Sequence, residues 1–409
     1  MKYRYACLVL ATAVILPVTC APALAAGADD SGTGTSTGTG TGTGDPGTTL
    51  LPPLPLRLGE DNPCTGASEE TATGAAWSQA TLGLPRAQRI SRGAGVTVAV
   101  VDTGVSADVP SLSGRVTALD GADEDCVGHG TFAAGLIAAA PEKGSGIAGV
   151  APEAEIVALR GTDDRGVPSA QRVALGIRAA ADEGAQVIYV GHALRTGKAE
   201  LSSAVAYAVE RDALVVAPAA PDAVPREELG PDNEMPVGPY WPAAAPGVLA
   251  VVDFGPSGLR QKNGPPAYEP DLSAPGSSMV SVGPKGAGHY IGSGASLAAA
   301  GAAGAAALVR GYRPELSAAE VSRQLLVTAY PSDTPRLDPY AALSLVSGGG
   351  KVGSRVEAVP ARLPEPVGSG PRNRALAVAG VGLGVVLLVG ALAAVLPRGR
   401  ARNWLPPGR

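Results

Sequence analysis

Short apolar runs alternate with longer stretches of helical spacing through the middle of this chain of 409 residues. The apolar runs, rich in Val, Ile and Ala, predict buried strands at 96–101, 156–159, 187–190, 213–217 and 248–252. Apolar residues that recur at helical spacing predict helices over 169–184, 201–212, 295–311 and 317–329, the last with capping-box spacing between Ser317 and Glu320. Strands that alternate with helices indicate an α/β fold, in which a mostly parallel sheet is covered by helices on both faces. Ligands bind such sheets beyond the carboxyl ends of the strands.

Two further apolar runs lie near the ends of the chain. Residues 1–25 begin with basic side chains, continue through an apolar run and end in Ala-Leu-Ala, which predicts a secretory signal peptide rather than an uncleaved anchor. Residues 375–396 carry no charge and would span roughly 33 Å as a helix, enough to cross a bilayer. Arg398, Arg400 and Arg402 follow, and positive charge favours the cytoplasmic side. We therefore expect a single-pass protein of the cell membrane, with its body outside and residues 397–409 as a cytosolic basic tail.

Composition divides the rest of the chain. Gly (56) and Pro (37) are abundant and concentrate in two segments, a Gly/Thr/Pro-rich linker at 26–60 and a Pro/Gly-rich stalk at 347–374. The remaining block, 61–346, suits one α/β domain. A net charge of −5 without a basic stripe argues against binding to nucleic acid.

Cysteine usage fits export. Cys7 and Cys20 would leave with the signal peptide, so Cys64 and Cys126 remain in the mature chain. In an exported protein such a pair is expected to form a disulfide, with two free thiols as the alternative.

Three residues carry candidate chemistry, each with a plainer alternative. Asp102 directly follows the first predicted strand, where an Asp also commonly forms a turn. His129 lies between two glycines before an Ala-rich apolar stretch, as a base near neutral pH or as a helix cap. Ser296 begins the Ala-rich helix, as a nucleophile helped by the helix dipole or as an N-cap, which composition alone favours.

The flanks of these residues resemble the motifs of the subtilisin-like (S8 family) serine peptidases. VAVVDTGV, GHGTFAAGLIAA and GSGASLAAAGAAGAAALV stand in that family's order, and the resemblance covers roughly residues 75–345. It is closest to the mycosins, the membrane-anchored subtilases of actinobacterial type VII secretion systems, through the Cys before the His motif, the DPYAAL ending (338–343), the stalk and the membrane helix. The resemblance implies a subtilisin-like fold and a triad of Asp102 as orienting carboxylate, His129 as general base and Ser296 as nucleophile. It also implies a polypeptide substrate and the type VII secretion machinery as a partner.

The resemblance breaks where the family places an oxyanion-hole Asn. The matching stretch, LVVAPAAPDAVP (214–225), puts Pro221 there without a gap and Asp222 with one inserted residue, which leaves the Ser296 backbone as the oxyanion donor. In the substrate-pairing strand Gly191 replaces the family's Ser and His192 follows, so both are expected beside the substrate.

Two functions therefore remain open. The first is a serine endopeptidase that cuts exported proteins or secretion components, and the second is a pseudo-peptidase that binds and stabilises a secretion complex. No cofactor or metal is expected, because the acidic run at 120–125 reads as a solvated loop rather than a Ca²⁺ site.

Overall fold

The computed structural model describes residues 50–262, 264–345 and 370–401 of the chain. The expected signal peptide, the linker up to residue 49, most of the stalk and residues 402–409 of the tail lie outside the described residues.

A seven-stranded sheet forms the centre of the domain, in the order β2-β3-β1-β4-β5-β6-β7 with every neighbouring pair parallel. The strands are β1 (Thr97–Asp102), β2 (Val116–Ala118), β3 (Glu155–Arg160), β4 (Val187–Val190), β5 (Leu214–Pro218), β6 (Leu249–Phe254) and β7 (Leu272–Pro275). The five predicted strands are confirmed as β1, β3, β4, β5 and β6. The two edge strands, β2 and β7, were missed because their sequences, VTA and LSAP, form no continuous run of apolar side chains.

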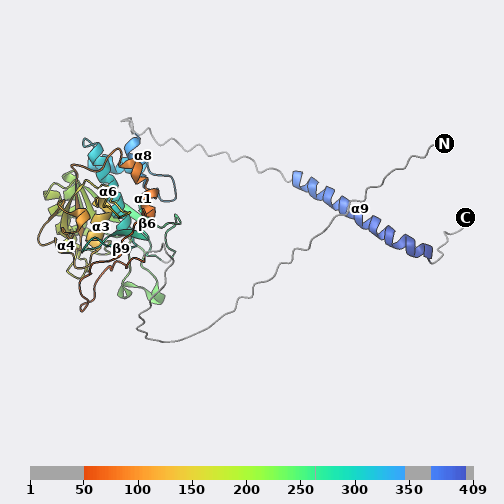
Figure 1. Cartoon of the computed structure of the whole chain (residues 1–409), viewed down its shortest axis with the longest axis horizontal. Coiled ribbons are helices and arrows are strands. Elements are labelled where there is room, and N and C mark those ends of the chain that lie inside the picture. Colours follow the sequence, from red (N-terminus) through yellow and green to blue (C-terminus); the bar gives the residue numbers. More distant parts are fainter. Residues whose placement is uncertain (1–49, 263, 346–369, 402–409) are drawn as a thin grey trace.

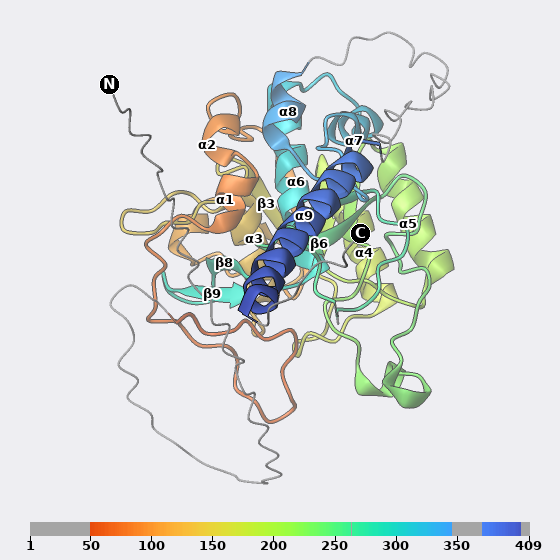
Figure 2. The same cartoon turned by 90° about the vertical axis from the view of Figure 1, so that its right-hand side faces the viewer.

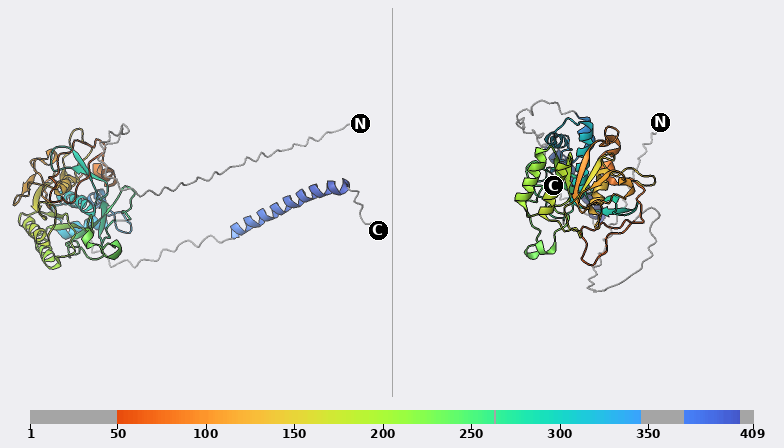
Figure 3. Two further views of the ribbon diagram at one scale, coloured as in Figure 1. Left: turned by 90° about the horizontal axis from the view of Figure 1, so that it is seen from below. Right: turned by 90° about the vertical axis from the view of Figure 1, so that its left-hand side faces the viewer.

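Helices cover both faces of the sheet, as predicted (Figures 2 and 3). One face packs against α4 (Ala170–Asp182) and α5 (Lys198–Glu210), which share a core cluster with alternate residues of the central strands. The other face packs against α3 (His129–Ala138) and α6 (Ala295–Tyr312). Helix α6 is buried from Ala295 to Arg310, and its alanines allow the backbone to lie close to the sheet.

The remaining elements surround this core. The helices are α1 (Trp77–Thr81), α2 (Leu84–Ala87), α7 (Ala318–Val327) and α8 (Pro339–Ser344), with 3₁₀ turns η1 (Pro110–Leu112), η2 (Arg226–Glu228) and η3 (Pro231–Asn233). An antiparallel pair is formed by β8 (Met279–Val282) and β9 (His289–Gly292). The predicted capping box of α7 is confirmed: the Ser317 hydroxyl accepts from the Glu320 N–H, and Glu320 accepts from the Ser317 N–H at 2.9 Å.

Helix α9 (Gly370–Ala401) stands apart from the domain (Figure 1). Its Asn373–Ala401 stretch, which contains an 18-residue window with a mean hydropathy of 2.6, is the one helix among the described residues that is long and apolar enough to cross a membrane. It contains the predicted span 375–396.

The end of the expected linker lies on the domain instead of running free. Within residues 50–60, the Leu54 N–H donates to the carbonyl of Ile291 in β9 at 2.8 Å, and the Ile291 N–H donates to Pro52 at 3.0 Å. The Leu58 N–H donates to the carbonyl of Arg165 at 3.0 Å. These contacts use backbone groups, which leave no apolar pattern in the sequence, so the sequence gives no sign that residues 50–60 lie on the domain.

Residues 50–76, which precede α1, are called the N-terminal segment here. The disulfide between Cys64 and Cys126 joins this segment to the loop before α3. Thr65 reinforces the junction, since its N–H donates to the Cys126 carbonyl at 2.9 Å and its hydroxyl to the Val127 carbonyl at 2.6 Å. The bridge closes a sequence separation of 62 residues.

Replacing both bridged cysteines by Ser is expected to lower the free energy of unfolding by roughly 2–4 kcal/mol, because the cross-link restricts the unfolded chain. Urea unfolding of the full chain in detergent measures the loss. Wild-type protein in reductant should shift by a similar amount, whereas an unchanged midpoint would contradict the structural role.

His289 ties the same segment to β9. Its buried ring accepts the Ala72 N–H at Nδ1 over 2.8 Å and faces the Ser145 hydroxyl at 3.3 Å from Nε2. A nitrogen that accepts carries no proton, so the contact requires the neutral ring. Burial lowers the pKa of His289 from 6.5.

The unfolded chain therefore takes up this proton first, and we expect stability to fall as the pH drops below 6.5 toward the folded-state pKa. The variant His289→Gln keeps an acceptor that does not titrate. Thermal unfolding between about pH 8 and pH 5 should show a shallower acid decline for this variant than for wild type. Parallel curves for the two proteins would exclude His289 as the cause.

Candidate active site

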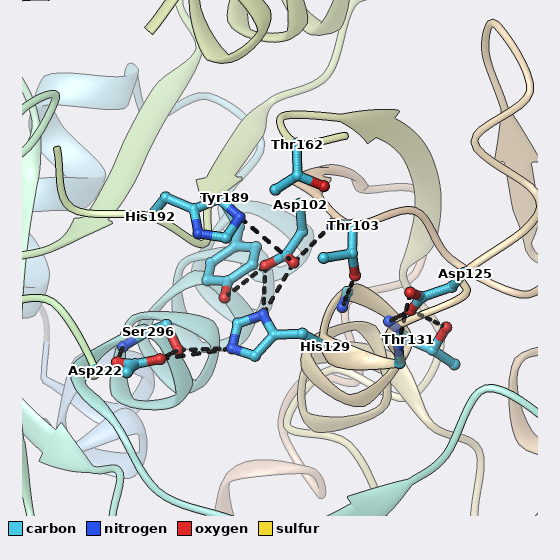
Figure 4. A network of polar contacts seen from close by, with 12 residues as sticks. Asp102, Thr103, Asp125, His129, Thr131, Thr162, Tyr189, His192, Asp222 and Ser296 are labelled. Atoms are coloured by element: carbon cyan, nitrogen blue, oxygen red, sulfur yellow. Dashed lines mark hydrogen bonds and ion pairs between the residues drawn. The ribbon is translucent and has the colours of Figure 1, made fainter. Parts of the chain in front are cut away.

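Three side chains from distant segments meet at the carboxyl end of the sheet (Figure 4). Asp102 ends β1, His129 begins α3, and Ser296 is the second residue of α6. His129 Nδ1 lies 2.9 Å from both carboxylate oxygens of Asp102, and its Nε2 lies 3.1 Å from the Ser296 hydroxyl. All three are buried. The structure thus brings together the three residues that the motifs indicated, in one hydrogen-bonded chain.

Their plainer alternatives do not describe this geometry. The N-cap of α6 is Gly294, with no side-chain cap, so Ser296 is not an N-cap. The N-cap of α3 is Gly128, and both ring nitrogens of His129 face other side chains. Asp102 does bind the turn after β1, through the Thr103 N–H at 2.7 Å, but it binds the imidazole as well.

A buried carboxylate that the sequence reasoning missed holds the start of α3. Asp125 accepts from the N–H of Gly128 at 2.7 Å, and from the N–H and hydroxyl of Thr131 at 2.8 and 2.7 Å. Burial raises the pKa of Asp125, although these hydrogen bonds oppose the rise. The expectation of a solvated loop over 120–125 is therefore wrong for its last residue. An Asp three residues before the helix N-cap was the available signal.

Opposite charges set the protonation of the triad. Burial would raise the pKa of Asp102, but His129, His192 and the Thr103 N–H lower it to about 2. Burial would lower the pKa of His129, yet Asp102 and then Asp222 raise it well above 6.5. The structure therefore favours an imidazolium, whereas a general base has to be neutral before it acts.

Asp222 lies directly in front of Ser296. Its Oδ1 accepts the Ser296 N–H at 2.9 Å, and its Oδ2 accepts the Ser296 hydroxyl at 2.5 Å and lies 3.5 Å from His129 Nε2. A Cβ on Gly294 would stand 2.1 Å from the carboxylate, so the glycine leaves the space that it fills. Of the two positions suggested for the missing Asn, the side chain at the nucleophile is that of Asp222 and not of Pro221. Asn233, an amide further along the same loop after β5, is exposed in η3.

The end of β4 closes the site behind Asp102. A Cβ on Gly191 would stand 1.8 Å from Asp102 Oδ2, so only glycine fits while the carboxylate stays in place. The buried Tyr189 hydroxyl donates to the same oxygen at 3.4 Å. Tyr189 was also missed, and its signal was the one polar group within an otherwise apolar strand.

His192 stacks on His129, with ring centroids 6.0 Å apart, and its Nε2 lies 3.8 Å from Asp102 Oδ1. Burial lowers the pKa of His192 and His129 lowers it further, while Asp102 and Asp222 oppose them.

Two hollows share His129 as a wall residue. A cleft of about 640 Å³ lies between the segments that follow β4 and β5, with Gly191, His192 and Asp222 among its walls and Leu194 and Tyr240 as apolar surface. A second hollow of about 310 Å³ lies between the N-terminal segment and residues 291–297. This shape suits an extended chain. Within 50–262, 264–345 and 370–401, no three His, Cys, Asp or Glu side chains are grouped to hold a metal.

Comparison with known proteins agrees with this geometry. The model of the Subtilase family, Peptidase_S8, matches residues 93–368. Mycosin-3 of Mycobacterium tuberculosis is 31% identical over 395 residues, which cover 80% of this chain and 84% of that protein. Thermitase of Thermoactinomyces vulgaris is 35% identical over 231 residues, which cover 55% of this chain and 78% of thermitase.

Solved structures give the same picture. MycP1 from the ESX-1 type VII secretion system is similar with a TM-score of 0.60 and 26% identity, over 72% of this chain and 94% of MycP1. A chain of an intact ESX-5 inner membrane complex is similar with a TM-score of 0.60 and 26% identity, over 85% of this chain and 96% of that one. With its parallel sheet, the Asp102–His129–Ser296 chain of hydrogen bonds and these matches, the protein belongs to the subtilase family of serine peptidases and, within it, to the mycosins.

Proposed function

We propose that this protein is a membrane-anchored serine endopeptidase that acts on polypeptides outside the cell and is associated with type VII secretion. The observation that carries the proposal is the continuous hydrogen-bonded chain from Asp102 through His129 to the Ser296 hydroxyl. The two hollows that His129 lines support an extended peptide as the substrate.

The geometry supports acyl transfer by a triad. With its imidazole ring neutral, His129 accepts the proton of Ser296 at Nε2, and the Ser296 oxygen attacks the peptide carbonyl. Asp102 holds the Nδ1–H tautomer and stabilises the imidazolium that results. His129 then gives this proton to the departing amine, and a water molecule releases the acyl group by the same steps. The Ser296 N–H is in place to donate to the developing oxyanion once Asp222 releases it.

Several observations support the proposed location. Helix α9 supports a single membrane anchor, and the similar chain in an ESX-5 inner membrane complex supports a secretion assembly as the partner. The basic residues after the apolar span favour a cytoplasmic tail. Protease added to intact cells should digest the domain and leave the tail, whereas digestion of the tail would contradict this orientation.

A second candidate, a pseudo-peptidase that stabilises a secretion complex, is favoured by one observation. The Ser296 N–H donates to the carboxylate of Asp222, so it is not free to bind an oxyanion. An oxyanion hole needs uncharged or positive donors, and a carboxylate beside it supplies none.

Incubation of the full chain, in detergent, with an unfolded protein decides between the two. Fragments that form with wild type and are absent with Ser296→Ala support the endopeptidase. No cleavage by wild-type protein that unfolds cooperatively would favour the binding role.

A further inference from the structure

The carboxylate of Asp222 directly contacts two residues of the triad, Ser296 and His129. The Ser296 N–H and hydroxyl donate to its two oxygens, His129 Nε2 lies 3.5 Å away, and Gly294 leaves room for the carboxylate. An ionised carboxylate only accepts hydrogen bonds, so in that form it repels the oxyanion. A neutral carboxylic acid has an O–H to donate, and buried acids serve as oxyanion donors in other enzymes.

The Ser296 hydroxyl links Asp222 to His129. Its oxygen lies 2.5 Å from Asp222 Oδ2 and 3.1 Å from His129 Nε2, so it can donate to one group and accept from the other. A proton on Nε2 can pass to the hydroxyl oxygen while the hydroxyl proton passes to Oδ2. This shift turns an imidazolium and a carboxylate into a neutral imidazole and a neutral acid. The number of bound protons does not change.

We propose that Asp222 is a catalytic residue that donates, as the neutral acid, the second hydrogen bond to the oxyanion. The inference rests on the proposed endopeptidase function. In the reacting state Asp222 leaves the Ser296 N–H to the carbonyl oxygen and directs its own O–H at the same atom. The Ser296 proton moves to the now neutral His129 as the bond from oxygen to carbon forms. When the tetrahedral intermediate collapses, the C–N bond breaks, His129 protonates the amine, and Asp222 keeps its proton.

Other titratable and charged groups lie around Asp222 and His129. Asp102, Tyr189 and His192 lie on the triad side, and Asp102 contacts both of the other two. On the far side Asp253 and Arg260 line a small hollow with Asp222 and pair with each other at 2.9 Å. Arg57, Arg195 and Glu228 line the large cleft.

If the active form carries one proton on the Asp222–His129 pair, the cleavage rate should fall at both low and high pH. A second proton blocks the base and produces an acid limb. Loss of the last proton removes the donor and restores the negative charge, which produces an alkaline limb.

Two variants of the full chain, Asp222→Asn and Asp222→Ala, test the proposal through cleavage of an unfolded protein across pH. Asn is a permanently neutral donor of similar shape, so the pH profile of this variant should lose the alkaline limb. Ala supplies no donor and should reduce kcat by about 10²–10³-fold, the cost of removing one oxyanion donor from a subtilisin.

The contrary outcomes separate this inference from the proposed function. If Asp222→Ala equals or exceeds wild type, or if the Asn variant keeps the alkaline limb, Asp222 is not a donor. An active Asn variant beside an inactive wild type would show a blocking residue, overturning this inference while supporting the triad. Inactivity of all three folded proteins would overturn the endopeptidase and this inference with it.

Discussion

Replacement of Asp102 by Asn is expected to lower kcat by about 10⁴-fold while the protein stays folded. The carboxylate accepts the His129 Nδ1–H through both oxygens at 2.9 Å, and Oδ1 also accepts the Thr103 N–H. An amide that keeps its oxygen on the Thr103 N–H turns its NH₂ toward Nδ1. The imidazole then carries its proton on Nε2, where it cannot accept the proton of Ser296.

Turnover of an unfolded protein substrate measures the effect, with the unfolding midpoint as the check on folding. Asp108→Asn is a matched control, because Asp108 is an exposed acid on the loop after β1. A loss below about tenfold for Asp102→Asn would mean that the carboxylate does not set the tautomer.

Replacement of Gly191 by Ala or by Ser is expected to reduce kcat by at least about 10²-fold. The added Cβ would stand 1.8 Å from Asp102 Oδ2, 2.7 Å from its Cγ and 3.0 Å from the Tyr189 hydroxyl. No relaxed geometry accommodates the first distance, so the carboxylate or the end of β4 must move. Displacement of a catalytic group by about 1 Å is enough for a loss of this size.

Gly301→Ala provides the matched control, because it adds the same methyl group in α6, where nothing outside the helix's own backbone lies within 4 Å. Its activity should match wild type. Overpacking at residue 191 should also cost about 1–3 kcal/mol of stability. Full activity of Gly191→Ala would show that Asp102 does not need its observed position.

Much of the fold could be predicted because it is recorded in local patterns. A strand buried on both faces leaves an uninterrupted apolar run, as in 98–101, and a helix leaves a periodic one, as in 317–329. Asp102, His129 and Ser296 each sit at a strand end or a helix start, where a turn or a cap explains them equally well. The resemblance of their flanking motifs to those of the subtilases is what identified them as a triad.

The rest depends on contacts that span long stretches of sequence. The contact between Asp222 and Ser296 could not be predicted from the sequence, because one inserted residue decides whether Asp222 or Pro221 matches the missing Asn. Only the path of the loop after β5 brings the carboxylate to Ser296. Asp125 lies in an acidic run that resembles a solvated loop, yet hydrogen bonds from the Gly128 N–H and from the N–H and hydroxyl of Thr131 offset the cost of its burial. Residues 50–60 bind through backbone groups, which any sequence possesses.

The most direct test of the central claim is labelling of the full chain with a fluorophosphonate probe, with Ser296→Ala as the control. An activated serine attacks the phosphorus atom and becomes covalently modified. We expect labelling of the wild-type protein that is absent from Ser296→Ala and strongly reduced in Asp102→Asn. Absence of labelling from wild-type protein that unfolds cooperatively would contradict this expectation, and would leave Asp102, His129 and Ser296 as parts of a scaffold without chemistry.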